Sequence, residues 1–452
     1  MSRPRLGADL APLRSSRDFR ILYASRTVAQ FGTQATEVAL LVQAKQLTGS
    51  TFAVGLLGAF EVLPLVVFGL YGGSLADRGD RRRVIRRCEA GLAVCAVLLT
   101  ANAALSHPSI WPLYAVTAVM MAMAALQRPS LEASIPRVVP RDQLTAAAAL
   151  LSMSQNASVI LGTALGGVLA AGPGPGVVYG LDTVTFTASL CLLMRLRPLP
   201  VASAAAAGGV AAPAPGSSAH ARGVPPEPEV PGPAQAPATG LRGIMTGLRY
   251  AGSRKDLLGS YLADLSAMIF AYPNALFPFI AASLHATWAV GLMFAAPSVG
   301  AFGVTVLSGW MGRVRRHGLA IALAAASWGV TIIAFGFAPD IGVALACLVV
   351  AGGADMISGI FRDTLWNQTI PDHLRGRLAG VELLSYGVGP SAGQVRAGAV
   401  ASLTTPRFSL VSGGLLCVGA VAVICLALPS FTGYRASQGQ PGPVAEAAGS
   451  DG

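Results

Sequence analysis

Acidic residues stand inside long apolar stretches of this chain, where charge is costly and usually serves a chemical purpose. Glu37, Glu61 and Asp355 each lie amid runs of Leu, Val, Ala and Gly, with Glu61 and Asp355 the deepest and most isolated. Ionisable residues inside membrane spans typically mark a pathway for protons, ions or substrate. A carboxyl group away from bulk water also takes up a proton more readily. Glu61 and Asp355, followed by Glu37, are therefore candidate sites for a proton or a cationic substrate.

Three other acids in these stretches have a plainer alternative. Asp264 is a candidate coupling residue, but pairing with Arg26 from the other half of the chain is an equally good interpretation. Asp182 and Glu382 lie close to the ends of their stretches, so solvation or helix capping is the simpler reading for both.

The composition indicates a helical membrane protein. Hydrophobic residues make up 53% of the 452 residues, charged residues only 12%, and the mean hydropathy is +0.59. Soluble proteins carry roughly twice that charged fraction. Lipid offers no hydrogen-bond partner to exposed backbone, so the apolar runs must be helices. The net charge of +11 then reflects arginines at one membrane face rather than nucleic-acid binding.

Twelve stretches are long and apolar enough to cross a membrane, which takes about 20 residues. They lie at 20–46, 52–76, 84–106, 109–132, 143–171, 177–196, 257–282, 287–311, 318–337, 341–366, 376–402 and 407–429. With the N-terminus in the cytoplasm, only Lys45 and Arg407 of the 32 Lys and Arg residues fall in outer loops, and Arg26 and Arg396 lie within spans. This asymmetry obeys the positive-inside rule. It predicts a multi-pass protein of the plasma membrane with both termini in the cytoplasm.

The chain divides into two halves around a segment rich in Pro, Ala and Gly. We predict a cytoplasmic N-terminal tail (1–19), an N-terminal six-helix bundle (20–197), a disordered cytoplasmic linker (198–240), an amphipathic interfacial helix (241–256), a C-terminal six-helix bundle (257–430) and a disordered cytoplasmic tail (431–452). Faint echoes between the halves indicate two parallel repeats, an arrangement that transporters use around a central site. The expected fold is an all-α membrane protein of twelve transmembrane helices in two parallel bundles.

One charged segment, "GGSLADRGDRRRV" (72–84), joins the second and third spans. It resembles the signature of the major facilitator superfamily, roughly G-x-x-x-D-R-x-G-R-R. The matching residues are Gly73, Asp77, Arg78, Arg81 and Arg82, and the departure is Asp80 in place of Gly. Together with "GTALGG" (162–167) and "NQTIPDHLRGRLAGVE" (367–382), the segment resembles the branch that includes the enterobactin exporter and related macrolide and drug efflux proteins.

The resemblance implies that Asp77 meets the start of the eleventh span at the inner face, where Arg375 and Arg377 add positive charge to a helix N-terminus. Arg128 is another candidate partner. We interpret Asp77 and Arg78 as an inner-gate latch, and the later arginines mainly as orientation signals.

Glycines in two spans indicate close helix contact. Gly162, Gly166 and Gly167 resemble the antiporter motif G-x-x-x-G-P-x-x-G-G, although Thr163 stands where that motif has Pro. Gly389 and Pro390 keep the Gly-Pro pair in the other half.

The resulting hypothesis is a secondary transporter that exports an amphiphilic small molecule, drug-like or siderophore-like, by proton antiport. We expect it to act as a monomer in the lipid bilayer. The alternative is an importer or lipid-moving transporter of the same superfamily. A membrane enzyme is disfavoured, because no Ser/His pair, HExxH motif or phosphate loop is present and none of the five His lies in mid-span. The six Cys are scattered, so we predict no metal and no cofactor.

Overall fold

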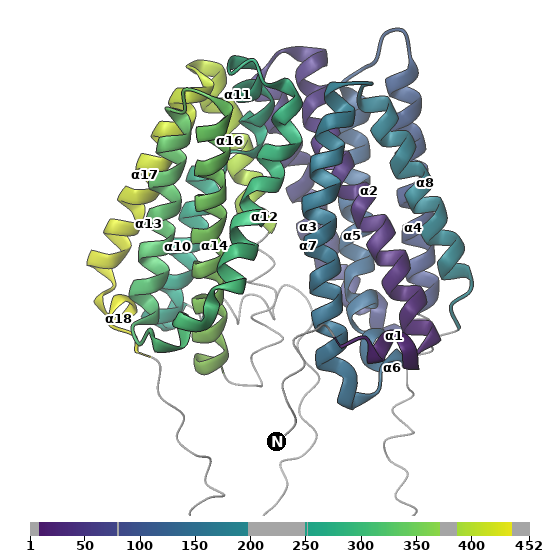
Figure 1. Cartoon of the computed structure of the whole chain (residues 1–452), viewed down its shortest axis with the longest axis horizontal. Coiled ribbons are helices and arrows are strands. Elements are labelled where there is room, and N and C mark those ends of the chain that lie inside the picture. Colours follow the sequence, from purple (N-terminus) through teal and green to yellow (C-terminus); the bar gives the residue numbers. More distant parts are fainter. Residues whose placement is uncertain (1–8, 79–80, 198–248, 251, 371–386, 436–452) are drawn as a thin grey trace, which may run out of the picture.

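The computed structural model describes residues 9–78, 81–197, 249–250, 252–370 and 387–435, with the backbone alone for 69–78. These residues form helices and their connections, without strands (Figure 1). The first half contains α1 (Ala11–Ser15), α2 (Arg17–Thr48), α3 (Thr51–Arg78), α4 (Arg81–Ala104), α5 (Trp111–Glu132), α6 (Ile135–Val138), α7 (Leu144–Ala171) and α8 (Pro175–Met194). The second contains α10 (Lys255–Ala271), α11 (Phe277–Ser283), α12 (Val290–Val306), α13 (His317–Gly336), α14 (Ile341–Thr369), α16 (Gly389–Leu403), α17 (Pro406–Ala427) and α18 (Pro429–Thr432).

Several of the long helices begin at a side chain that caps the first turn. Ser16 Oγ accepts the backbone N–H of Phe19 at 3.1 Å, so α2 begins at Arg17, a few residues before the predicted span. Asp340 caps α14 and Thr405 caps α17 in the same way. These side chains satisfy N–H groups that have no partner inside the helix. At its other end α2 stops at Gly49, whose φ of +63° allows the tight join to α3.

The helices coincide with the predicted spans. Eight described segments are both long and apolar enough to cross a membrane: Thr51–Phe68, Arg141–Ala171, Pro175–Met194, Lys255–Ser283, Thr287–Val306, His317–Gly336, Ile341–Thr369 and Pro406–Ala427. Helices α2, α4, α5 and α16 occupy the other four predicted positions. The start of the eleventh span, the 198–240 linker and most of the 241–256 interfacial helix lie outside the described residues. The protein is a multi-pass helical membrane protein, as the sequence predicted.

Two bundles lie side by side in Figure 1, α2–α8 on the right and α10–α17 on the left. We call the end near α11 the upper face and the end near α1, α6 and α18 the lower face. The ribbons of the two bundles are closest near the upper face and diverge toward the lower face. Each bundle is held by its own buried apolar side chains, such as Phe186 in the first and Phe335 in the second.

Small residues bring the bundles together along two seams. In the α3–α16 seam, a Cβ added to Gly55 would lie 2.6 Å from the carbonyl oxygen of Gln394 and 2.9 Å from Cα of Gly398. In the α7–α12 seam, a Cβ on Gly167 would collide with the backbone of Gly291. Thr51 Oγ1 donates a hydrogen bond to the Gly398 carbonyl at 3.1 Å beside the first seam. These residues lie in the upper halves of their helices, so the upper side of the molecule is closed.

The seventh predicted span is broken near its upper end. Helix α10 ends at Ala271, Tyr272 has an extended backbone with ψ of 115°, and the chain passes through a short 3₁₀ turn (Asn274–Leu276) into α11. Pro273 accounts for the break, because proline cannot continue the hydrogen-bond ladder of a helix, and Pro278 occupies the first turn of α11. Lys45 Nζ of α2 donates to the Pro278 carbonyl at 2.6 Å, which adds a polar tie across the upper face.

Replacing Gly167 with Leu should force the α7–α12 seam apart and open the upper face. Gly180 on α8 is the matched control, because nothing lies within 4 Å of a Cβ placed there. Spin labels at the exposed positions 46 and 288, in a background without native cysteines, report the separation of the bundles. We expect Gly167→Leu to lengthen this distance and Gly180→Leu to leave it unchanged. An unaltered distance in Gly167→Leu would show that the seam does not hold the closed state.

Candidate functional site

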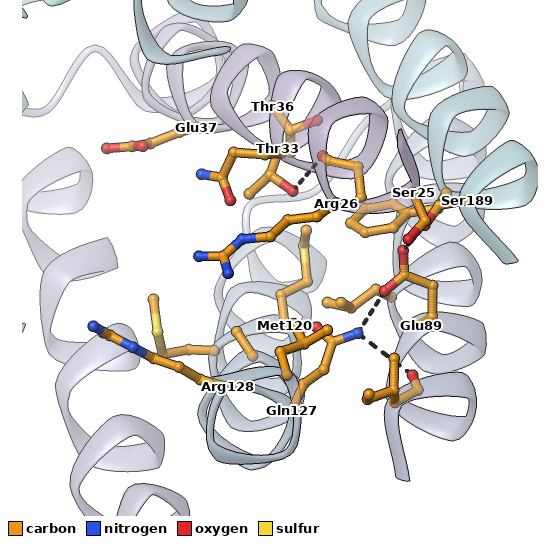
Figure 2. Close-up of a pocket in the computed structure, with 18 of the residues that line it drawn as sticks. Ser25, Arg26, Thr33, Thr36, Glu37, Glu89, Met120, Gln127, Arg128 and Ser189 are labelled. Atoms are coloured by element: carbon orange, nitrogen blue, oxygen red, sulfur yellow. Dashed lines mark hydrogen bonds between the residues drawn. The ribbon is translucent and has the colours of Figure 1, made fainter. Parts of the chain in front are cut away.

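A cavity of about 460 Å³ opens in the N-terminal bundle (Figure 2). Its lining comes from α2, α3, α4, α5, α7 and α8 and runs from Glu37 and Glu61, in the upper halves of their helices, to Arg128 and Leu193 near the lower face. The apolar part of the lining consists of Leu40, Leu92, Met120, Met121, Phe186 and others. Methionines adapt to ligands of irregular shape. The cavity thus combines an adaptable apolar wall with charged groups of both signs.

One face of α2 supplies a polar stripe to this cavity. Arg26, Gln30, Thr33 and Glu37 follow one another at spacings of four, three and four residues, which places them on one helix face. Figure 2 shows Arg26 and Glu37 projecting to the same side. No described residue hydrogen-bonds or ion-pairs with the Arg26 guanidinium. Arg26 is therefore a positive charge presented to whatever enters the cavity.

The three acids that the sequence singled out come from three different helices, and the fold brings all of them into range of one tyrosine. Glu61 Oε2 accepts hydrogen bonds from Ser391 Oγ at 3.2 Å and Gln394 Nε2 at 3.4 Å, both on α16. Glu37, Glu61 and Asp355, from α2, α3 and α14, all lie within electrostatic range of the Tyr272 phenol. Sequence reasoning selected these residues one by one, and the fold gathers them where the two bundles meet. No group of three or more His, Cys, Asp or Glu among the described residues is placed to hold a metal ion.

Asp264 occupies a different environment from the other candidates. Its carboxylate forms an ion pair with Arg362 of α14, and both side chains are only 3% exposed. The Arg362 guanidinium lies 5.8 Å from the ring centroid of Trp366, which stacks on Tyr261. The alternative partner from sequence, Arg26, is not the one observed, because Arg362 in the same bundle satisfies Asp264. This pair sits in the core of the C-terminal bundle and does not line the described cavity.

Asp182 is fully buried, so its interpretation as a solvated or capping residue is wrong. Thr36 Oγ1 donates to one carboxylate oxygen at 2.7 Å and Thr185 Oγ1 to the other at 3.2 Å. The residue lies a full two turns inside α8, facing α2, and ties these helices together.

Glu89 on α4 was missed by sequence reasoning. It lines the cavity and accepts hydrogen bonds from Ser189 Oγ and from Gln127 Nε2, the latter at 2.6 Å (Figure 2). Its proximity to Arg81–Arg87 made it look like part of the charged loop. The spacing of Ile85, Glu89, Leu92 and Leu99 was the available signal, because these residues share the buried face of α4.

The arginines of the charged segment do more than orient the chain. Arg81 donates to the Ala133 carbonyl at 2.6 Å and Arg82 to the Met194 carbonyl at 2.7 Å, so they hold the start of α4 against the ends of α5 and α8. Arg128 pairs with Glu132 at 3.0 Å on an exposed surface. The side chains of Gly73, Asp77 and Arg78, together with Arg375, Arg377 and Glu382, lie outside the described residues.

The predicted packing glycines contact three different helices. Gly162 and Gly166 face Phe31 and Ala35 of α2, whereas Gly167 faces α12 across the bundle interface. Gly389 begins α16 and faces Met268 of α10, and Pro390 occupies the first turn of α16, where its missing N–H does no harm. The α3–α16 seam of Gly55 and Gly398 was not anticipated from the sequence.

Comparison with known proteins agrees with this architecture. A family model described as a transmembrane secretion effector matches residues 7–211. The enterobactin exporter EntS of Citrobacter koseri is 28% identical over 457 residues, covering 99% of this chain and 100% of the relative. The EntS of Shigella flexneri is 26% identical over 426 residues, covering 92% of this chain and 94% of the relative.

Solved structures show the same fold at low sequence identity. A bacterial homologue of the human lysosomal transporter Spinster, in an inward-facing and unoccupied conformation, has a TM-score of 0.68 at 16% identity and covers 93% of this chain and 98% of its own. The nucleoside transporter NupG has a TM-score of 0.66 at 12% identity and covers 92% of this chain and 100% of its own.

With its two bundles closed at one face around a polar and apolar cavity, this multi-pass helical membrane protein is similar in fold to solved membrane transporters. The chain has the major facilitator fold. Within that class it resembles the branch that includes the enterobactin exporter, as its charged segment and span-five glycines indicated.

Replacing Asp264 with Ala should strongly destabilise the C-terminal bundle, because it leaves the Arg362 guanidinium buried without its carboxylate. Breaking one side of a buried ion pair costs about 3–5 kcal/mol. The double variant Asp264→Ala/Arg362→Met should recover most of the loss, since no charge is then stranded. Thermal unfolding of the detergent-purified protein measures both effects, with the exposed Asp142→Asn as control. Equal losses in the single and double variants would contradict this account.

Proposed function

We propose that the protein is a secondary active transporter of the plasma membrane that exports an amphiphilic siderophore in exchange for protons. The observation that carries the proposal is that Glu37, Glu61 and Asp355 all lie within electrostatic range of Tyr272, and that Glu37 and Glu61 also line a cavity of mixed polarity. The names of the relatives supply the substrate class, since they are enterobactin exporters that match nearly the whole chain. In this proposal both termini lie in the cytoplasm and the protein acts as a monomer.

The proposed cycle is alternating access, with the lower face as the cytoplasmic face. The bundles contact each other through the glycine seams and the Lys45–Pro278 tie in the upper half, while the cavity extends toward the lower face. This arrangement suits a transporter that takes its substrate from the cytoplasm. Opening to the outside requires the upper contacts to separate and the lower ends to approach.

Glu61 is the proposed link between protonation and this movement. As a carboxylate it accepts two hydrogen bonds from α16 of the other bundle. The Ser391 hydroxyl and the Gln394 amide can also bond the neutral carboxyl group, so a proton on Glu61 removes its charge without breaking the α3–α16 seam. The proton would then be taken up from outside while the upper face is open and released through the cavity to the cytoplasm once that face has closed, so that one proton moves inward as substrate moves outward. Asp355 and Glu37 lie close enough to tune this step.

The cavity wall fits an amphiphilic substrate. Leu92, Met120 and Phe186 offer apolar contact, and Arg26 and Glu37 offer one charge of each sign at opposite ends of the α2 stripe. Polar groups placed in an apolar pocket fix the orientation of a ligand.

Everted membrane vesicles supply the deciding experiment for function. An exporter should load enterobactin into them and consume an inside-acid pH gradient as it does so. We expect Glu61→Gln to abolish uphill loading while leaving exchange of labelled for unlabelled enterobactin, because the substrate path is intact. Asp142→Asn at the exposed lower face is the control and should behave as the native protein. If right-side-out cells that carry the native protein lose enterobactin only when the pH gradient is reversed, the result would instead support the importer alternative.

A second prediction concerns the proposed latch at the lower face. In the outside-open state the lower ends of α3 and the eleventh span should meet, and Asp77 would there face positive charge. We expect Asp77→Asn to cripple enterobactin export with unchanged amounts of protein in the membrane. Asp80→Asn, three residues further along the chain, should retain export. Unaltered export by Asp77→Asn would remove the latch from the mechanism.

A further inference from the structure

The wall of the cavity contains an acid that the transport cycle above does not use. Glu89 is only 3% exposed, yet it belongs to the cavity lining. One carboxylate oxygen accepts from the Ser189 hydroxyl and the other from the Gln127 amide. Its two partners come from α8 and α5, so three helices of the N-terminal bundle meet at this group (Figure 2).

The charges around Glu89 leave it without a cation. The ionisable groups facing this region are Arg26 and Glu37 of α2, Glu61 of α3, Cys88 of α4, Arg128 and Glu132 of α5 and Asp182 of α8. Arg128 has Glu132 as its ion-pair partner. Among the described residues, Glu89 forms no ion pair with Arg26 or with any other cation. A buried carboxylate with only neutral partners is costly, and uptake of a proton removes that cost.

Both hydrogen-bond partners can serve the charged and the neutral form of Glu89. A hydroxyl can donate or accept by rotating its hydrogen, and an amide presents either its NH₂ or its carbonyl oxygen by turning about its last bond. Protonation therefore requires no movement of the helix backbone. Asp264 differs, because the fixed positive charge of Arg362 holds it as a carboxylate.

Asp182 provides an internal comparison. It is as buried as Glu89 and is likewise held by two rotatable donors, Thr36 and Thr185. However, Asp182 is not part of the cavity lining, so water in the cavity does not reach it directly. The two acids thus differ mainly in access to the cavity.

We propose that Glu89 is a second proton-binding site of this transporter, loaded and emptied through the cavity. The proton comes from cavity water, forms an O–H bond to the Glu89 carboxylate and returns to water on release. This inference rests on the proposed proton coupling. It adds a second, separate site, since Glu61 lies at the interface between the bundles whereas Glu89 lies within one bundle. Substrate and proton would then bind in the same cavity.

Transport by the protein reconstituted into liposomes tests how many protons are coupled to each substrate molecule. The logarithm of enterobactin accumulation is measured against the imposed pH gradient, and each coupled proton contributes about tenfold per pH unit. We expect Glu89→Gln to lower the slope by about one, and Asp182→Asn to leave it unchanged. A merely structural role for Glu89 would lower the rate without changing the slope. An unchanged slope in an active Glu89→Gln protein overturns the proposal.

Infrared difference spectroscopy of the purified protein tests the same site without transport. Acidification should produce a carboxylic C=O band in the native protein, in Asp182→Asn and in Glu89→Asp, which retains a titrating group. A component of that band should be missing in Glu89→Gln. If the spectra of native and Glu89→Gln proteins are identical, the proposal is wrong even where transport is proton-coupled. If native protein shows no uphill transport, the proposed function fails, and the infrared result still decides the role of Glu89.

Discussion

The close approach of backbones at the two glycine seams is the constraint on which the rest of this structure depends. Gly55 against Gly398 and Gly167 against Gly291 leave no room for a side chain, so α3–α16 and α7–α12 meet at backbone distance in the upper half of the molecule. In a membrane such contacts rest on van der Waals packing rather than on the hydrophobic effect. Because the seams close only the upper half, the cavity below them extends toward the lower face.

Buried acids in this protein occupy three distinct settings, and these settings assign them different tasks. Asp264 has a permanent cation in Arg362 and stabilises its bundle. Asp182 has only hydroxyl partners and lies away from the cavity. Glu61 and Glu89 also have neutral partners but face the cavity, where a proton can arrive and leave. The partner and the access to water, rather than the depth in the membrane, separate structural acids from candidate coupling acids.

Much of the architecture was predictable because lipid forces apolar runs to be helices, and because arginines mark one side of the membrane. The candidate acids Glu37, Glu61 and Asp355 were also predictable, since their isolation in apolar spans is visible in the chain. Pairing was not. Arg362 lies close to the end of its span, and nothing in the spacing tells that it reaches Asp264 rather than solvent. Glu89 was missed because it follows five arginines closely in the sequence, although its side chain is buried. Contacts between distant helices depend on packing angles that hydropathy does not encode.

The Asp264–Arg362 pair has a consequence for how the molecule moves. Both of its members belong to the same bundle, as do those of the Arg128–Glu132 and Arg254–Asp256 pairs. Rocking one bundle against the other then breaks glycine contacts and a few hydrogen bonds, but no buried ion pair in this part of the chain. Separating a buried ion pair would raise the barrier to this exchange, because each charge would be left without its partner. Charged groups such as Lys45 and Glu61 at the interface then separate from neutral hydrogen-bond partners of the other bundle rather than from a counter-ion.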